Sequence, residues 1–443
     1  MWIPRFYWSI GFGVDLGHVV PNSVRGGATM MSNNNPEIVV IGGGISGAAF
    51  ATVMAKAGHS VLMLEITEVH RDVVRGEWMA PWGVNEAKRL GLYETYRANG
   101  GHHLARHVGY DELVTASEAE ARAVDFAAMF PGFEGPMTLG HPKLCGILDD
   151  LAVASGVTFI RGVRKTSVTA GEPPVVRFEH QGQAFEYRPR LVVAADGRHG
   201  KTVQQVGIQM KADPVHHWFS GMLVENAFDW PDDLQVIGTA GDINFFIFPQ
   251  GQGRVRLYQG VALSDKERFM GDDAPKRFAE GFRLSCVPQS EAIAESKPAS
   301  HCFVYPNNDT WSDEPYVPGV VAIGDAAGHN DPIIGQGLSI AHRDVRVLTD
   351  ILKSTADWSM VSLAAYGEER AERLRRLRLS ARFSSVRDCE FGEGARARRG
   401  KLHGMMLSDP VVTGLTLALF VGPEAFPAEV FSDAALEGAL NAA

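Results

Sequence analysis

A glycine-rich run, Gly42-Gly43-Gly44-Ile45-Ser46-Gly47, constrains the fold of this chain more than any other feature. It satisfies the pattern GxGxxG directly after the apolar, β-branched run 37–41, and residues 46–57 are small and compatible with a helix. In such a unit the glycines permit a tight turn, close approach of a pyrophosphate to the backbone, and packing of the helix on the strand. The helix N-terminus adds N–H donors and a positive dipole end. The run predicts a Rossmann-like opening.

A carboxylate about 20 residues further on strengthens this prediction. Glu65 ends the second apolar run, 61–64, where its carboxylate can accept hydrogen bonds from both ribose hydroxyls of an adenosine. A glycine turn packed for its own sake would not require this acidic residue. We therefore predict dinucleotide binding, and the residues of this first motif that we assign to it are Gly42, Gly44, Ile45, Ser46, Gly47 and Glu65.

Composition excludes several classes of protein. The chain has 443 residues, 45% hydrophobic and 21% charged, which is typical of a globular protein large enough for two packed domains. Its net charge of -10, with both signs interspersed, argues against a nucleic-acid partner. The four cysteines form no CxxC pair, so we expect no disulfide framework and a reducing cytoplasm. The apolar stretch 411–421 is too short to span a bilayer, so we expect no stable membrane insertion.

The first residues differ from the rest of the chain. They are aromatic at the start and then glycine-rich, and a polar run, 32–36, leads directly into the first strand. We expect residues 1–35 to be a non-native or disordered extension, with translation starting at Met30 or Met31. A secretory signal is the alternative interpretation.

Hydrophobic patterning predicts an α/β fold with three further parts. The alternation typical of strands is strongest from about 215 to 305, and the pattern of a buried strand returns at 320–323. The charged run 368–382 is interpreted as a solvated helix face. We assign residues 36–214 and 311–355 to two parts of a nucleotide-binding domain, 215–310 to an antiparallel substrate-domain sheet, and 356–443 to C-terminal helices.

Two more motifs follow predicted strands. Asp196-Gly197 follows the strand 191–195, and Gly324-Asp325-Ala326-Ala327 follows 320–323 and continues through Pro332 to Gly335-Gln336-Gly337. In this order, GxGxxG, ADG and GDAA with PxxGQG, the motifs resemble the FAD-dependent monooxygenases typified by p-hydroxybenzoate hydroxylase, the class A flavoprotein hydroxylases. The resemblance extends from about Pro36 to Arg382. It implies FAD in a Rossmann-like domain of the glutathione-reductase type.

The resemblance also implies roles for individual residues. Asp325 would bind the ribityl or pyrophosphate region, and the backbone from Gly335 to Leu338 would donate hydrogen bonds beneath the pyrimidine end of the isoalloxazine. The family usually has Arg where this chain has His141, and this difference bears on how NAD(P)H is received. The further cofactor-binding residues that the resemblance implies are Arg75, Gly76, His141, Asp196, Gly324, Gln336 and Gly337.

The activity that the resemblance implies is oxygen transfer. NAD(P)H would reduce the FAD, O2 would add at C4a, and the hydroperoxide would hydroxylate or epoxidise a small organic, aromatic substrate. Three alternatives stay open on the same fold: a flavin-dependent reductase resembling the geranylgeranyl reductases, a halogenase, and a non-enzymatic prenyl-lipid binding protein. The halogenase lacks support because the chain has no WxWxIP-like segment. A separate flavin reductase as partner is also open.

Candidates for the substrate pocket come from the predicted sheet. His217, Asn244, Phe246 and Tyr258 could face the flavin, and Pro332 is expected to line the flavin side. His216, His217 and His329 are the candidate general bases for a phenolic substrate, because histidine titrates in the useful range. These histidines do not have the spacing of metal ligands, so we predict no metal.

Overall fold

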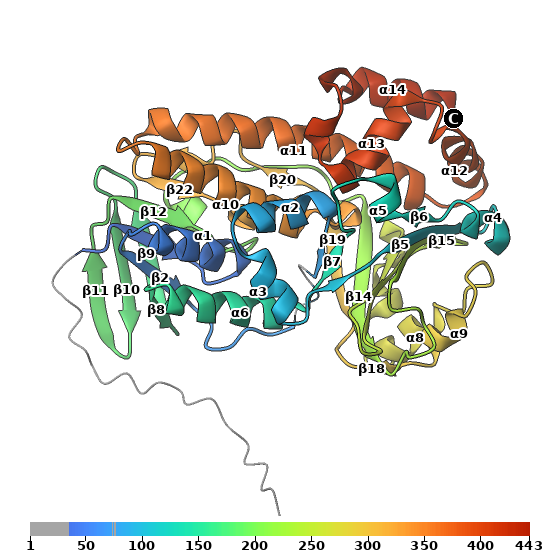
Figure 1. Ribbon diagram of the computed structural model, residues 1–443, viewed down its shortest axis with the longest axis horizontal. Helices are drawn as coiled ribbons and strands as arrows, with labels where there is room; N and C mark the ends of the chain where they lie inside the picture. The colour runs from blue at the N-terminus through green and yellow to red at the C-terminus, as the bar shows by residue number, and fades with distance from the viewer. Residues whose placement is uncertain (1–34, 73, 75–76) are drawn as a thin grey trace, which may run out of the picture. The chain divides into compact units, whose positions relative to one another are not determined.

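The computed structural model describes residues 35–72, 74 and 77–443 (Figure 1). The predicted extension, apart from Asn35, and the predicted cofactor residues Arg75 and Gly76 lie outside the described residues. Those expectations stay predictions.

The first sheet contains the glycine-rich turn. Its strand order is β21–β22–β12–β1–β2–β8, and all neighbours are parallel except β21 and β22. Every residue of the central strands is buried, as expected where both faces of a parallel sheet are covered. The strands are β1 (Ile38–Ile41), β2 (Val61–Glu65), β8 (Thr158–Arg161), β12 (Leu191–Ala194), β21 (Tyr316–Val317) and β22 (Val320–Ala322). The pairing of β22 with β12 joins segments over 120 residues apart, and confirms the predicted return of a buried strand.

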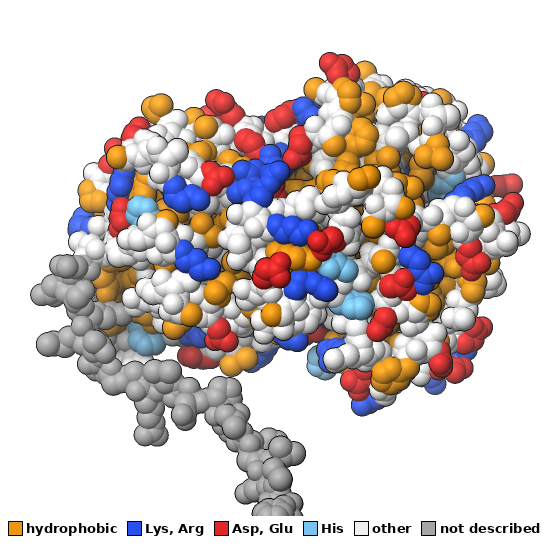
Figure 2. Space-filling view, viewed as in Figure 1, with side chains coloured by type: hydrophobic (Ala, Val, Ile, Leu, Met, Phe, Trp, Pro, Cys, Tyr) orange, Lys and Arg blue, Asp and Glu red, His pale blue; other side chains and the backbone are white. Residues whose placement is uncertain are grey.

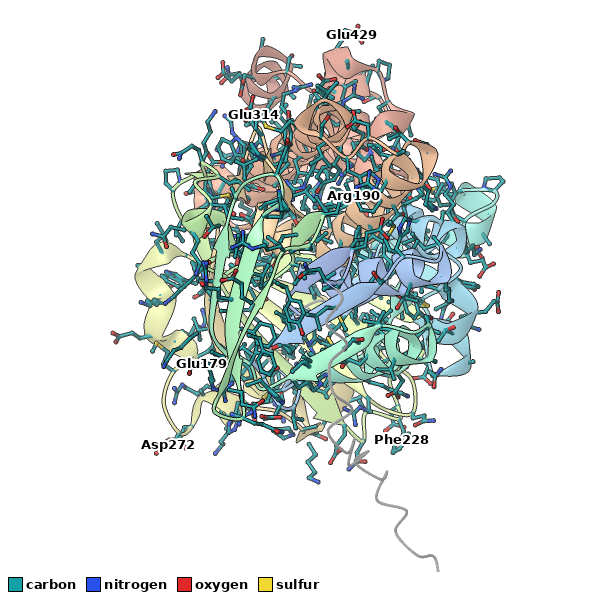
Figure 3. The ribbon with its side chains drawn as sticks, turned by 90° about the vertical axis from the view of Figure 1, so that its left-hand side faces the viewer. Glu179, Arg190, Phe228, Asp272, Glu314 and Glu429 are labelled. Atoms are coloured by element: carbon teal, nitrogen blue, oxygen red, sulfur yellow. The ribbon has the colours of Figure 1, made fainter. Side chains whose placement is uncertain are left out.

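Different layers cover the two faces of this sheet. Helices α1 (Ile45–Lys56), α6 (His141–Ala154) and α10 (Gly337–Ser354) pack against one face in a large apolar core. A small antiparallel sheet covers the other face, made by β9 (Arg164–Thr169), β10 (Val175–His180) and β11 (Gln183–Tyr187). Strands β10 and β11 form a hairpin, with Gln181 and Gly182 both at positive φ. Figure 3 views the molecule from this side, with Glu179 of β10 labelled.

The second sheet has the order β18–β14–β17–β16–β15–β5–β6, and β19 also pairs with β14. Its strands are β5 (Arg106–Asp111), β6 (Val124–Asp125), β14 (His217–Glu225), β15 (Leu234–Ala240), β16 (Ile243–Pro249), β17 (Val255–Val261), β18 (Lys297–Pro298) and β19 (Phe303–Asn307). Strands β5 and β6 come from the segment that we assigned to the first part of the nucleotide-binding domain, and β5 pairs parallel with β15. The sheet is therefore built across the sequence boundary at 214.

The two faces of the second sheet have different neighbours. Phe245 and Ile247 of β16 pack in a core with α8 (Ala274–Glu280) and α9 (Ser290–Ala294). The alternate residues Phe246 and Phe248 point to the opposite face and belong to a separate cluster with aromatic residues. This second face is the one that borders the cavity described below.

Long helices connect the two sheets. Helix α11 (Met360–Asp388) runs from the first sheet towards the second, and α12 (Glu393–Met405), α13 (Pro410–Val421) and α14 (Asp433–Ala442) lie near the second sheet (Figure 1). In the described chain no single helix combines the length and apolarity needed to cross a membrane. Helices α12 and α13 meet that test only as a pair, and the pair is bent by 85°.

Shorter elements complete the described chain. A three-stranded sheet is formed by β3 (Trp78–Met79), β7 (Met137–Thr138) and β4 (His102–His103), and β13 (Lys211–Ala212) pairs with β20 (Thr310–Trp311). The remaining α-helices are α2 (Pro81–Arg89), α3 (Tyr93–Ala98), α4 (Ala116–Glu120), α5 (Phe126–Met129) and α7 (Thr202–Gln205). On the face shown in Figure 2, acidic and basic side chains are interspersed.

Candidate functional site

The glycines of the GxGxxG turn have different surroundings. Gly42 has φ +105°, and a Cβ on it would lie 2.3 Å from the carbonyl oxygen of Ala195. A Cβ on Gly47 would lie 2.0 Å from the carbonyl oxygen of Gly42. Both glycines are therefore required by packing. Gly44 differs, because a Cβ there would meet nothing within 4 Å and the residue borders the cavity.

Glu65 is held beside this turn. Its Oε2 accepts a hydrogen bond from the backbone N–H of Gly43 at 2.7 Å, and its Oε1 accepts from the backbone and hydroxyl of Thr67 at 2.8 and 2.7 Å. The carboxylate is thereby fixed at the carboxyl end of β2, adjacent to the open side of the turn. This is the position in which a ribose of a dinucleotide would be recognised.

The GDAA segment lies against the glycine-rich turn. Gly324 has φ +58°, and a Cβ on it would lie 2.2 Å from Oγ of Ser46. The two motifs, nearly 280 residues apart in sequence, are thus in direct contact. Asp325 follows at the carboxyl end of β22 and borders the cavity.

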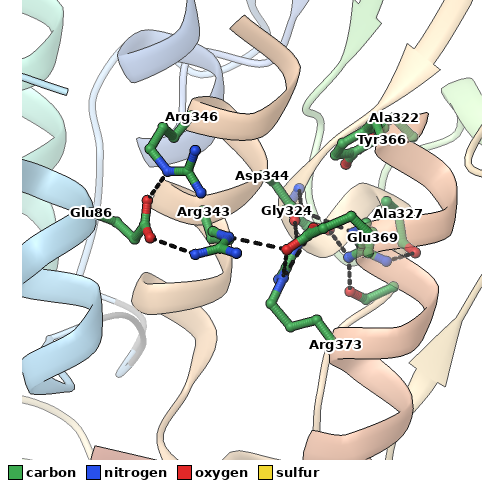
Figure 4. A network of polar contacts seen from close by, with 12 residues as sticks. Glu86, Ala322, Gly324, Ala327, Arg343, Asp344, Arg346, Tyr366, Glu369 and Arg373 are labelled. Atoms are coloured by element: carbon green, nitrogen blue, oxygen red, sulfur yellow. Dashed lines mark hydrogen bonds and ion pairs between the residues drawn. The ribbon is translucent and has the colours of Figure 1, made fainter. Parts of the chain in front are cut away.

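A buried arginine, Arg370, holds this segment in place. Figure 4 shows the surrounding network of polar contacts, with Gly324, Ala327 and Asp344 labelled. The guanidinium of Arg370 donates to the carbonyl oxygens of Gly324, Ala327 and Gly328 at 2.9–3.1 Å, and to Oδ2 of Asp344 at 2.9 Å. Asp344 also accepts from the backbone N–H of Gly324 at 2.9 Å. The Arg370 side chain thus satisfies three carbonyl oxygens of one tight loop.

The interpretation of 368–382 as a solvated helix face is wrong for Arg370 and Arg373. Both are buried, and both pair with Asp344 of α10, with Nη2 of Arg373 at 2.7 Å from Oδ1. The two guanidinium charges together lower the pKa of Asp344, against the opposing effect of burial. Sequence could not separate these arginines from their exposed neighbours, because their partner lies on another helix.

The GQG turn is fixed by its central side chain. Gln336 is fully buried, its Oε1 accepts from the indole N–H of Trp82 at 2.7 Å, and its Nε2 donates to the carbonyl oxygens of Ile334 and Leu419 at 2.7 and 3.1 Å. Gly337 begins α10, and a Cβ there would meet nothing within 4 Å. The first N–H groups of α10 therefore border open space.

One cavity of about 1220 Å³ unites these motifs. It extends from the GxGxxG turn, past Asp325 and the start of α10, to the second sheet and the C-terminal helices. The predicted residues that border it are Gly44, Ile45, Ser46, His141, Phe246, Tyr258, Asp325, His329, Pro332, Gly335, Gln336, Gly337 and Leu338. The predicted residues that are not part of its lining are Gly42, Gly47, Glu65, Asp196, His217, Asn244 and Gly324.

Of the histidines considered as general bases, His329 is the one placed on the cavity wall. Its Nδ1 lies 2.8 Å from Oγ1 of Thr310, which fixes the ring. His217 is fully buried, and its ring contacts Asn307 at 2.9 Å and His216 at 3.1 Å. Burial lowers the pKa of His217 to about 3, so it is neutral at physiological pH.

Asn244 and Asp196 have local partners. The amide of Asn244 donates to the carbonyl oxygen of Gly238 at 2.8 Å, within the second sheet. Oδ2 of Asp196 accepts from the backbone N–H of Thr202 at 3.0 Å and from its hydroxyl at 2.8 Å, beside the short helix α7. The residues after Asp196, Gly197 and Arg198, border the cavity instead.

The part of the cavity next to the GQG turn is aromatic. Trp78 stacks on Phe248 with ring centroids 5.9 Å apart, and Phe246 meets the edge of Tyr258 at 6.4 Å. Phe219 and Tyr305 complete this wall. We call these six residues the aromatic chamber. Sequence analysis missed Trp78, Phe219, Phe248 and Tyr305, although the alternation along β14 and β16 placed Phe219 and Phe248 on the same faces as His217 and Phe246.

A buried ion pair lies beside this chamber. Arg256 of β17 pairs with Glu77 and with Asp72, whose Oδ2 lies 2.8 Å from Nη2. Burial would lower the pKa of Arg256, but the two carboxylates outweigh it and keep the guanidinium charged. Glu77 borders the cavity and accepts from the backbone N–H of His141 at 3.3 Å, so it connects α6 to the second sheet.

These features fit an FAD. The open space at Gly44 and Gly337 leaves room for a pyrophosphate and a ring system, and Glu65 and Asp325 supply carboxylates at the ends of β2 and β22. Among the described residues no group of three or more His, Cys, Asp or Glu side chains is placed to hold a metal ion.

Comparison with known families agrees with this geometry. A family model described as an FAD binding domain matches residues 35–379. The chain belongs to this FAD-binding family. Its described fold is that of the p-hydroxybenzoate hydroxylase type, as the resemblance in sequence implied.

Individual proteins of known name resemble this FAD-binding chain in sequence or in structure. Squalene monooxygenase of Rattus norvegicus is 24% identical over 349 residues, and the match covers 76% of this chain but only 58% of the relative. A 3-amino-4-hydroxybenzoate 2-monooxygenase of Streptomyces platensis is 25% identical over 80% of this chain and 89% of its own length. The crystal structure of p-nitrophenol 4-monooxygenase from Pseudomonas putida DLL-E4 superimposes with a TM-score of 0.72 at 16% identity, covering 87% of this chain and 96% of that one. Reductases and halogenases share the fold as well.

Proposed function

We propose that this protein is an FAD-dependent monooxygenase that hydroxylates or epoxidises a small, apolar or aromatic organic molecule. One observation carries the proposal: a single cavity runs from the dinucleotide motif, past the N-terminus of α10, into the aromatic chamber. A cofactor held by the motif would thus share its space with an apolar substrate. The monooxygenases among the relatives support the same class of reaction.

FAD, when bound, supplies the redox chemistry. In the overall reaction NAD(P)H gives two electrons, one oxygen atom of O2 enters the substrate, and the other leaves as water. The chain contributes the environment. The N–H groups at the start of α10 stabilise negative charge near the pyrimidine end of a flavin, because they carry the positive end of the helix dipole. The apolar wall of Trp78, Phe246 and Phe248 excludes water from the reacting atoms.

His329 is the residue that we assign as proton acceptor for a phenolic substrate. It borders the cavity three residues before Pro332, and its contact with Thr310 orients the ring. The neutral His217 lies behind the wall, so we assign it a structural role in the second sheet.

The test is an anaerobic absorbance titration of the purified protein with NADPH and NADH, followed at the flavin band near ~450 nm. We expect bound flavin, and reduction that a phenol or another aromatic compound accelerates. Oxygen uptake that depends on the same compound, with hydroxylated product detected by mass spectrometry, would establish the reaction.

Other results would redirect the proposal. Flavin that binds but is never bleached by either nucleotide points to a separate flavin reductase as the electron source. Substrate turnover that proceeds without O2 would identify a reductase and overturn the monooxygenase. A protein without any flavin affinity would overturn the enzymatic proposal altogether.

A further inference from the structure

The cavity continues beyond the aromatic chamber. Its far part lies between β5 and β15 of the second sheet and the helices α11, α12 and α13. We call this part the distal chamber. The polar residues that line it include His107, Asp111, Arg122, Thr239, Arg387, Asp388, His403 and Thr416. None of the motifs that bind a dinucleotide reaches this chamber, so a cofactor does not account for it.

The buried charges in the distal chamber cancel one another. Arg387 donates to both carboxylate oxygens of its neighbour Asp388 at 2.8 and 2.7 Å. Asp111 is paired with the buried Arg399 at 2.8 Å. The buried charged groups of the distal chamber therefore have opposite charges in contact, whereas Arg122, which also lines the cavity, is exposed on the segment after α4.

The histidines of the chamber add no charge. Burial lowers the pKa of His107 to about 4, and burial also lowers the pKa of His403, with the Arg387 charge acting in the same direction. Neutral imidazoles and hydroxyls can donate and accept hydrogen bonds. The buried part of the distal chamber therefore suits an uncharged group that forms hydrogen bonds, because its own charges are already paired with one another.

The distal chamber opens to the surface. Exposed residues of the lining mark its mouth, among them Arg122 after α4, Met129 at the end of α5, which is 48% exposed, and Leu407 after α12, which is 90% exposed. Phe126 of α5 and Phe420 of α13 are in ring contact at 5.4 Å, so α5 lies beside α13. Gly404, also exposed, lies on the same rim.

We propose that this rim is the substrate entrance, and that the substrate is an elongated, uncharged molecule. Its apolar or aromatic part lies in the aromatic chamber, and its other end reaches the distal chamber as a hydroxyl, carbonyl or amide. The inference rests on the proposed function, because it takes the aromatic chamber as the place of reaction. The flavin end of the cavity is closed to the substrate when the dinucleotide fills it.

The binding test uses isothermal titration calorimetry on the purified holoprotein, so it requires no turnover. The probes are p-cresol and three phenols with an eight-carbon chain in the para position, ending in a hydroxyl, a carboxylate or an ammonium group. We expect the hydroxyl probe to bind at least about tenfold more tightly than p-cresol, because the chain buries apolar surface. We also expect the hydroxyl probe to bind about tenfold or more tightly than either charged probe, since the charge of those probes would be left without a partner.

A matched pair of variants tests the entrance. Gly404 and Gly394 both lie in α12, and at both positions a Cβ would meet nothing within 4 Å, but only Gly404 borders the cavity. We expect Gly404→Trp to slow binding of the hydroxyl probe in stopped-flow measurements by about tenfold or more, because the indole narrows the rim. Gly394→Trp should leave the rate unchanged. Flavin content and melting temperature check that both variants fold.

Two results would overturn the inference. The first is a carboxylate or ammonium probe that binds as tightly as the hydroxyl probe. The second is equal binding rates in the two tryptophan variants. Both measurements are independent of oxygen uptake. Binding that depends on the eight-carbon chain of the probe, without turnover, would therefore contradict the proposed function and leave the inference standing. Turnover of p-cresol, without any effect of that chain on binding, would support the proposed function and contradict the inference.

Discussion

The backbone N–H of Asp331 donates a hydrogen bond to Oδ1 of Asp309 at 3.0 Å, so two buried carboxyl groups lie next to each other beside the cavity. Burial, reinforced by the nearby Asp331 charge, raises the pKa of Asp309 to about 8. Burial likewise raises the pKa of Asp331 to about 7, although its hydrogen bond from the Ile333 N–H opposes the shift. Near neutral pH the pair therefore holds at least one proton.

This pair predicts a loss of stability as the pH rises from about 4 to about 8. A carboxyl whose pKa is higher in the folded state than its ordinary 3.8 binds its proton more tightly when folded, so its stabilising contribution is present at low pH. That contribution is lost as the pH rises through about 7 to 8. We expect the free energy of unfolding to fall between about pH 4 and pH 8, by up to about 1.4 kcal/mol per pH unit for each group, and to level off at higher pH.

The variant Asp309→Asn keeps an acceptor for the Asp331 N–H and removes one of the titrating groups. We expect the free energy of unfolding of this variant to depend less on pH than that of the parent protein, measured by urea unfolding at pH 5, 6, 7 and 8. Asp313→Asn is the control, because Asp313 is exposed and pairs with Lys211 at the surface. Parallel curves for the parent and Asp309→Asn would contradict the prediction.

Arg370→Met should destabilise the protein by about 3 to 5 kcal/mol, because it leaves a buried network without its central cation. Three carbonyl oxygens of the Gly324–Gly328 loop would lose their donor. We expect FAD affinity to fall with it, measured by flavin fluorescence on titration. Arg382→Ala, an exposed position in the same helix α11, should change stability by less than about 1 kcal/mol.

Gly44→Ala and Gly47→Ala should separate cofactor binding from folding. The methyl group of the first variant enters open space where we expect the pyrophosphate, so FAD affinity should fall about tenfold or more with the melting temperature of the apoprotein unchanged. The methyl group of the second collides with the Gly42 carbonyl, so it should lower stability by about 1 to 3 kcal/mol. Equal losses of apoprotein stability in both variants would show that Gly44 is also needed for packing.

His329→Gln should lower the rate of phenol turnover on the order of 10²-fold, which is typical for loss of a general base. Its pH–rate profile should lose the limb that reports the imidazole. The variant His217→Gln should preserve that limb, because His217 lies behind the cavity wall and is already neutral. Identical profiles for His329→Gln and the parent protein would remove His329 from the mechanism.

Local pattern was sufficient for much of the fold. The strands at 37–41, 191–195 and 320–323 were all predicted, since each is specified by a short continuous apolar pattern. The participation of β5 in the second sheet was not predicted, because nothing in residues 106–111 indicates that their partner strand lies 128 residues further on. Long-range pairing of strands is decided by tertiary packing.

The candidate site was likewise predicted in part from the sequence. The motifs that surround a dinucleotide follow strands of the same sheet, so their convergence could be inferred from the order of the strands. The orientation of single side chains could not: Asn244 and His217 lie on the predicted strands, yet both find partners within the wall. The distal chamber was missed entirely, because His107, Arg387 and His403 come from three elements whose docking no motif encodes.

The hydrogen bond from Gln336 to the Leu419 carbonyl gives the C-terminal helices a role beyond enclosure. Since the same amide side chain also fixes the GQG turn through Ile334 and Trp82, a movement of α13 away from the sheet must strain the turn that begins α10. A ligand that binds at the rim beside α13 can therefore alter the GQG turn at the proposed flavin site, although the ligand and the turn are not in contact. The chain has the mechanical means to make electron uptake sensitive to the presence of its substrate.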